Sequence, residues 1–203
     1  MVTGWFGAHM KRVGFVISIT SAACALCLAI ERRSFCDEPV LEQPKGCEVG
    51  AGIPSFYVRD VMGRRPDLAT CLVCKYGARP VALVCVRELD AKSEALIEAI
   101  DRTIDSHRGD GLRGFAMFLT GRASELQPKL ATLAHRRGLS LPLAIPVENG
   151  GPGALDLPDD AQAIVLLYRR KQIVERFVFA ADELTDEKTQ EVAAAADRFA
   201  TAE

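Results

Sequence analysis

Residues 81–86 read Val-Ala-Leu-Val-Cys-Val, and this run constrains the fold more than any other feature of the chain. Six consecutive apolar residues, three of them valine, are typical of a strand that is buried on both faces. Residues 114–119, Gly-Phe-Ala-Met-Phe-Leu, predict a second strand of the same kind. An amphipathic helix is predicted between them, from a cap at Asp90 to about residue 107. Strands joined through a helix should be parallel, so we expect an α/β protein.

The part of the chain after residue 119 extends this pattern. Helices are predicted over residues 124–137 and after the cap Thr185, with an extended segment over 141–147. Residues 163–168 and 173–179 read as two strands of a hairpin. The expected order is strand, helix, strand, helix, strand, strand, helix. It predicts a three-layer sandwich with a central mixed sheet whose last two strands are antiparallel.

Length and charge limit the classes of function. The chain has 203 residues, with 49% hydrophobic and 26% charged residues, as expected of one globular domain with a short leader. Lysine and arginine number 25 and aspartate and glutamate 27, so the net charge is −2. This balance gives no bulk attraction to polyanions, and we expect no nucleic-acid partner.

The first thirty residues have the pattern of an export signal. Lys11 and Arg12 precede an uncharged run over residues 13–30, which ends in small residues at Cys27-Leu28-Ala29. A basic start, an apolar core and a small-residue exit predict a signal peptide over residues 1–30. An uncleaved membrane anchor is the alternative, because the run approaches the roughly 20 residues of a spanning helix. We expect an exported protein of the periplasm or cell envelope, which contacts membrane only through an uncleaved N-terminal segment.

The proline- and glycine-containing stretch over residues 31–53 predicts a flexible arm ahead of a domain over residues 54–203. Cleavage after Ala29 would leave five of the seven cysteines, in a compartment where disulfides persist. Cys36 and Cys47 bracket most of the arm and are candidates for a structural disulfide. Cys85 lies inside the apolar run of residues 81–86, so we expect a core thiol.

Cys71 and Cys74 form a CxxC motif, with Lys75 beside it. As a redox pair, Cys71 would be the attacking thiolate and Cys74 the resolving thiol, while the Lys75 cation would lower a thiol pKa. The same two cysteines could instead form a fixed structural disulfide that pins the loop before the first strand. Zinc needs four ligands and this motif supplies two; Cys36 and Cys47 could complete the set, but their spacing is not that of a zinc knuckle. A covalent haem needs a histidine after the second cysteine, where Lys75 stands, so we expect neither a metal nor a cofactor.

This element order, with a CxxC in an exported chain, resembles the thioredoxin-like superfamily over roughly residues 54–200. The stretch Cys-Leu-Val-Cys-Lys-Tyr-Gly at 71–77, followed by Arg-Pro-Val at 79–81, looks like a subgroup of exported bacterial thioredoxin- and peroxiredoxin-like proteins. The resemblance implies a thioredoxin-like fold. It also implies thiol–disulfide exchange by Cys71 and Cys74, with thiols or disulfides of envelope proteins as partners.

The chain departs from redox-active members of that superfamily at two places. They carry the CxxC after the first core strand, whereas here residues 87–90 read Arg-Glu-Leu-Asp and the motif precedes the strand. They also carry a cis-proline just ahead of the third core strand, where residues 159–162 read Asp-Asp-Ala-Gln and Pro158 is the nearest proline. Two functions therefore stay open: an oxidoreductase with a relocated pair, or a non-catalytic binding or structural domain with a structural disulfide.

Overall fold

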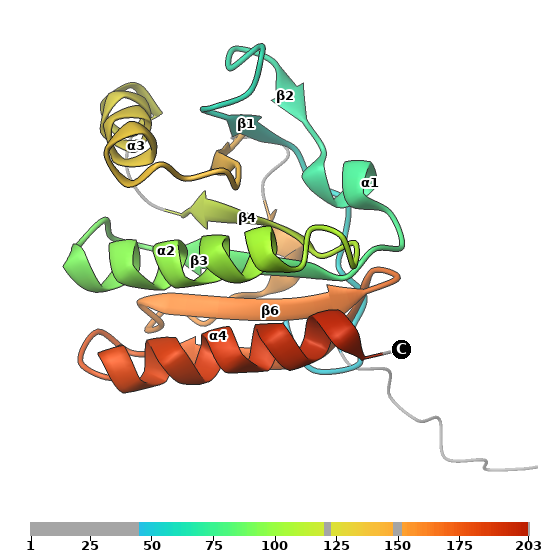
Figure 1. Cartoon of the computed structure of the whole chain (residues 1–203). Helices are drawn as coiled ribbons and strands as arrows, with labels where there is room; N and C mark the ends of the chain where they lie inside the picture. The colour runs from blue at the N-terminus through green and yellow to red at the C-terminus, as the bar shows by residue number, and fades with distance from the viewer. Residues whose placement is uncertain (1–44, 120–122, 148–151, 203) are drawn as a thin grey trace, which may run out of the picture. The chain divides into compact units, whose positions relative to one another are not determined.

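Seven strands form one mixed sheet in the computed structural model, which describes residues 45–119, 123–147 and 152–202 (Figure 1). Their order across the sheet is β2-β1-β5-β4-β3-β6-β7. Their bounds are β1 (Val58–Asp60), β2 (Ala69–Thr70), β3 (Val81–Val86), β4 (Arg113–Phe118), β5 (Leu143–Pro146), β6 (Ala163–Arg169) and β7 (Gln172–Phe179).

The centre of the sheet is parallel and its flanks are antiparallel. β3 pairs in parallel with β4, and β4 pairs in parallel with β5. β6 runs antiparallel to both β3 and β7, so the predicted hairpin and the mixed sheet are confirmed. The predicted extended segment over residues 141–147 contains β5, which joins β4 to the short hairpin of β1 and β2.

Both faces of β3 are buried, as its apolar run predicts. The described helices are α1 (Leu72–Tyr76), α2 (Ala91–Ser106), α3 (Ala123–Arg137) and α4 (Asp186–Thr201), with a 3-10 turn over Pro152–Leu155. Even-numbered residues of β3 join a core cluster with α2, α3 and α4, while odd-numbered residues join a second cluster with α1 and the segment from Cys47 to Phe56. Figure 1 shows α2 and α4 side by side in front of β3 and β6, and α1 apart from them.

The last part of the predicted arm belongs to the fold. Cys47, Ala51 and Ile53 are each at most 4% exposed. The Gly50 N–H donates to the Ile173 carbonyl at 2.8 Å, and the Ile53 N–H donates to the Lys171 carbonyl at 2.8 Å. The expectation of a flexible arm up to residue 53 is therefore wrong for residues 45–53, because their apolar side chains cover one face of the sheet.

The predicted signal peptide or anchor and the first part of the arm lie outside the described residues. Within the part of the chain that the structure describes, no helix is both long enough and apolar enough to cross a membrane.

Candidate functional site

The Cys71–Cys74 disulfide lies on α1, immediately before β3. The two Cα atoms are 5.2 Å apart. Cys71 is the N-cap of α1, and its Sγ accepts the backbone N–H of Cys74 at 3.1 Å. The helix ends at Gly77, whose φ of 61° lets its N–H return to the Val73 carbonyl. The motif therefore sits at the amino end of β3, on a single turn of helix.

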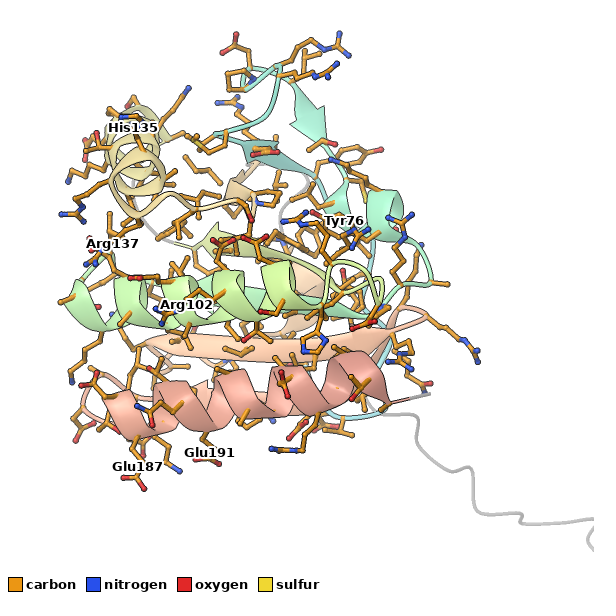
Figure 2. The ribbon with its side chains drawn as sticks, in the orientation of Figure 1. Tyr76, Arg102, His135, Arg137, Glu187 and Glu191 are labelled. Carbon is orange, nitrogen blue, oxygen red and sulfur yellow. A yellow bond between two sulfur atoms is a disulfide. The ribbon has the colours of Figure 1, made fainter. Side chains whose placement is uncertain are left out.

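Packing of one side of α1 fixes this turn to the sheet. Leu72 and Val73 are buried, and the ring of Tyr76 packs against Phe115 with centroids 6.2 Å apart. The side chain of Tyr76 is labelled in Figure 2. Its hydroxyl donates to the Gly114 carbonyl at 3.2 Å. Burial, together with the Asp60 carboxylate, raises the pKa of Tyr76 to about 12, so the donor keeps its proton at neutral pH. A buried face thus holds the opposite, solvent-facing side in place.

The two sulfurs differ in surroundings. Cys74 is exposed and Cys71 is half-buried. The Oγ of Ser55, on the segment before β1, lies 3.4 Å from the Cys74 Sγ. A disulfide sulfur carries no hydrogen, so the Ser55 hydroxyl is the donor in this contact. Sequence reasoning missed Ser55, because no motif links it to a cysteine 19 residues further along the chain.

Lys75 is exposed beside the motif and interacts electrostatically with Asp60, at the end of β1. Burial raises the pKa of Asp60, against the smaller lowering effects of the Met62 N–H and the Lys75 cation. These two residues help to line an open groove of about 620 Å³. The groove borders the CxxC through Thr70, which precedes Cys71, and Lys75, which follows Cys74.

The opposite end of β3 contains a polar network instead of a disulfide. Arg87 donates its Nε to the Ala161 carbonyl at 2.9 Å and its Nη2 to the Pro158 carbonyl at 2.8 Å. Asp90 and Ser93 form the capping box of α2, with the Ser93 N–H donating to Asp90 at 2.7 Å. The carboxyl end of β3, where the resemblance to redox-active thioredoxin-like proteins would put a CxxC, is filled here by contacts that hold loops and a helix end.

Cys47 and Cys85 both lie in the core. Cys85, in β3, is fully buried, and burial strongly raises the pKa of its thiol. Cys47 is buried with a free thiol, whose Sγ lies 3.8 Å from the Asp156 carbonyl as a weak donor. Cys36 lies outside the described residues, so the Cys36–Cys47 disulfide stays a prediction. Among the described residues, no group of three or more potential ligand side chains could hold a metal ion.

No protein-family model matches the sequence, and no curated protein is detectably similar to it. Several solved structures are nevertheless similar to this chain in fold. A thiol:disulfide interchange protein from Bacteroides sp. shares 11% identity, with a TM-score of 0.55 over 76% of this chain and 91% of that one. A secreted disulfide oxidoreductase of Mycobacterium tuberculosis shares 8%, with a TM-score of 0.52 over 70% and 96% of the two chains. The bacterioferritin comigratory protein of Xanthomonas campestris, studied for alkyl peroxide reduction, shares 11%, with a TM-score of 0.58 over 76% and 100%.

Proposed function

We propose that this chain, which has the thioredoxin-like fold, exchanges its Cys71–Cys74 disulfide with thiols of partner proteins. The observation that carries the proposal is the position of the disulfide. It lies on the solvent-facing side of a helix whose other side is buried, and a groove opens beside it. A bond that another molecule can reach, on a firmly held support, is what thiol–disulfide exchange requires.

The surroundings of the two sulfurs favour different roles from those expected from sequence. Exposure makes the Cys74 Sγ the atom that a partner thiolate attacks. The S–S bond then breaks and its electron pair leaves on the Cys71 Sγ, which already accepts the Cys74 N–H. Such a hydrogen bond favours the thiolate and makes it the better leaving group.

A second thiolate of the partner completes the reaction. It attacks the partner sulfur of the mixed disulfide, and the electron pair of that bond leaves on Cys74. The partner is then oxidised to a disulfide and Cys71 and Cys74 are both reduced. Run in reverse, the Cys74 thiolate attacks a partner disulfide and Cys71 resolves the mixed disulfide. The Ser55 hydroxyl, 3.4 Å from the Cys74 Sγ, would stabilise the Cys74 thiolate in either direction.

The short loop that the Cys71–Cys74 disulfide closes argues against a purely structural role for this bond. The disulfide joins residues only three apart. Closing so short a loop restricts the unfolded chain little, and the chain-entropy model gives about 2 kcal/mol, near the low end of such effects. The buried side chains of Leu72, Val73 and Tyr76 already hold α1 in place.

We further propose that the exchange takes place outside the cytosol. The basic and apolar pattern of residues 1–30 and the description of one structural neighbour as secreted both support this location. Partner proteins would then be thiols or disulfides of the cell envelope.

The reduction potential of the Cys71–Cys74 pair tests the proposal. The purified full chain would be equilibrated with glutathione buffers, and exposed thiols counted at each ratio. We expect the pair to titrate within the range of known exchange proteins, above about −270 mV, while Cys47 and Cys85 stay unreactive until the chain is denatured. A potential well below about −300 mV would identify a structural bridge and overturn the proposal.

A further inference from the structure

The groove beside the disulfide is built mainly by the loop between β1 and β2. Met62, Arg64, Arg65 and Leu68 line it, and Thr70 and Lys75 connect it to the CxxC. A partner that reaches the Cys74 sulfur therefore meets this loop at the same time. The chemistry of the loop should decide which partners are favoured.

The groove displays apolar side chains to solvent. Met62 is 48% exposed and Leu68 is 49% exposed. They are two of only five large hydrophobic side chains that are exposed among the described residues, and both line this groove. Exposed apolar side chains grouped in one concave surface are typical of a binding site.

The charge of the groove is predominantly positive. Arg64 and Arg65 are exposed, and neither makes a hydrogen bond or ion pair through its side chain to another described residue. Lys75 adds a third cation, while Asp60, half-buried and bonded to the Met62 N–H at 3.1 Å, is the one carboxylate in the described lining. Asp67 belongs to the same loop but does not line the groove. Three cations against one carboxylate should attract an anionic segment.

The loop is held in shape before any partner arrives. The Gly63 N–H donates to the Asp60 carbonyl, and the Leu68 N–H donates to the Arg65 carbonyl, each at 3.1 Å. β2 is the outermost strand on its side of the sheet. Its outer edge can therefore pair with an extended segment that runs toward Cys71.

We propose that this groove binds an extended segment of the partner protein, rich in acidic residues and with a large apolar side chain, next to the partner's reactive cysteine. The apolar side chain packs on Met62 and Leu68. The acidic side chains lie against Arg64, Arg65 and Lys75. The cysteine part of this inference rests on the proposed exchange at Cys74, whereas the binding of the segment does not.

Binding is tested with peptides in which serine replaces the cysteine, so that no redox step takes part. One fluorescent peptide carries leucine and several aspartates, and its counterpart carries lysines in place of the aspartates. We expect the full-length oxidised protein to bind the acidic peptide at least about tenfold more tightly in fluorescence anisotropy, with a preference that falls as salt is added. Equal binding of the two peptides would overturn the proposal.

The double variant Arg64→Glu with Arg65→Glu should abolish or reverse this preference. A matched control, Lys129→Glu with Arg198→Glu, makes the same change in net charge on α3 and α4, away from the residues that line the groove. If the control weakens binding as much as the groove variant, the attraction is only one of net charge and the proposal fails. Tighter binding of a single-stranded DNA of equal charge would overturn the choice of a protein partner.

Cysteine-containing versions of the peptides separate the two proposals. If dithiothreitol and both peptides reduce the disulfide at similar rates and the serine peptides show no charge preference, the groove proposal fails and the exchange function stands. If the acidic serine peptide binds selectively but no thiol reduces the pair, the exchange function fails and the groove remains a docking site without chemistry.

Discussion

The two ends of β3 carry opposite kinds of polar structure. At the carboxyl end, Arg87 donates to the Pro158 and Ala161 carbonyls, and Asp90 and Ser93 close the first turn of α2. These groups satisfy one another within the chain. At the amino end, the Cys71–Cys74 disulfide is presented outward on α1 beside a groove lined by cations. Polar groups bonded internally support a fold, whereas polar and reactive groups left at the surface are available to a partner.

This difference separates substitutions that should affect exchange from those that should affect stability. A change in the cysteine pair should remove the reaction and leave the fold, and a change at Arg87 should do the reverse. Substitutions on the contacts that hold α1 lie between these limits, since the same contacts support the fold and position the disulfide.

The largest effect is expected from the single cysteine variants. Cys74→Ser removes the exposed sulfur, so we expect complete loss of exchange with a protein disulfide and no mixed disulfide. Cys71→Ser also stops turnover, but the remaining Cys74 thiol should trap the partner as a stable mixed disulfide, seen as a mass increase under non-reducing conditions. Trapping by Cys71 in the Cys74→Ser variant, rather than by Cys74, would contradict the assigned roles.

The second largest effect is expected on stability, from a substitution of Arg87 at the carboxyl end of β3. Arg87→Leu leaves the Pro158 and Ala161 carbonyls without this donor, and hydrogen bonds to a charged group are worth about 1.5–3 kcal/mol each. Because the Arg87 side chain is 23% exposed, water partly replaces the lost donor. We therefore expect the free energy of unfolding in urea to fall by about 2–4 kcal/mol, less than the sum of two such bonds, while the exchange rate of the folded protein stays unchanged. Arg102→Leu, an exposed arginine of α2 (Figure 2), is the control and should change stability by no more than about 0.5 kcal/mol. A large loss of exchange in folded Arg87→Leu would place chemistry at the carboxyl end.

The elements with strong apolar periodicity could be predicted from sequence, because their burial pattern is local. The strand predicted over residues 81–86 has the same bounds as β3, and the predicted cap Asp90 is the N-cap of α2. Residues 45–53 could not be assigned correctly, because only their contacts with β7 and the turn before it distinguish a docked segment from a flexible one.

The site was predictable in part for the same reason. The spacing of Cys71 and Cys74, and their place before the strand, can be read directly from the chain. Which sulfur is exposed depends on how α1 packs, so the roles that we propose for Cys71 and Cys74 differ from those that the motif alone predicts. The contact of Ser55 with Cys74 and the grouping of Met62 with Leu68 depend on the folded hairpin.

A smaller loss of stability is expected from Gly114→Ala, at the amino end of β4. A Cβ on this residue would lie 2.6 Å from the Ala82 carbonyl oxygen and closer still to the end of the Ile104 side chain. The backbone oxygen cannot move aside freely, so we expect a loss of about 1–3 kcal/mol and a looser α1, because Tyr76 bonds the Gly114 carbonyl. Gly109→Ala is the control, since a Cβ there meets no atom within 4 Å. Equal losses of stability in urea would contradict this account.

Tyr76→Phe removes one hydrogen bond and keeps the ring. We expect a loss of about 1 kcal/mol in the free energy of unfolding, because the Gly114 carbonyl loses a buried donor. The hydrogen-exchange rates of the α1 backbone amides should rise more than those of the α2 amides, because this hydrogen bond connects α1 to β4. A uniform rise across both helices would mean that Tyr76 stabilises the whole fold and does not specifically position the disulfide.

The smallest effect is a pH dependence at the amino end of β4, where His107 follows α2. Its ring nitrogens lie 2.8 Å from Asp110 and 2.7 Å from Asp197 on α4, and these hydrogen bonds raise its pKa. A raised pKa means that the folded state favours the protonated ring. The stabilisation is therefore full below the ordinary histidine pKa of about 6.5 and is lost as pH rises through the higher folded value.

His107→Gln should accordingly destabilise the protein more at pH 5.5 than at pH 8.5 in urea unfolding, whereas His135→Gln, at the exposed end of α3 (Figure 2), serves as the matched histidine control. The loss caused by Arg87→Leu should be the same at both pH values, because no histidine takes part in its bonds to the Pro158 and Ala161 carbonyls. The contrast between the two ends of the parallel strands β3 and β4 then becomes measurable as a pH dependence of stability. The contacts of His107, at the amino end of β4, weaken as the ring loses its proton. The contacts of Arg87, at the carboxyl end of β3, do not weaken over this range. An equal loss for His107→Gln at both pH values would show that its bonds to Asp110 and Asp197 do not depend on its charge.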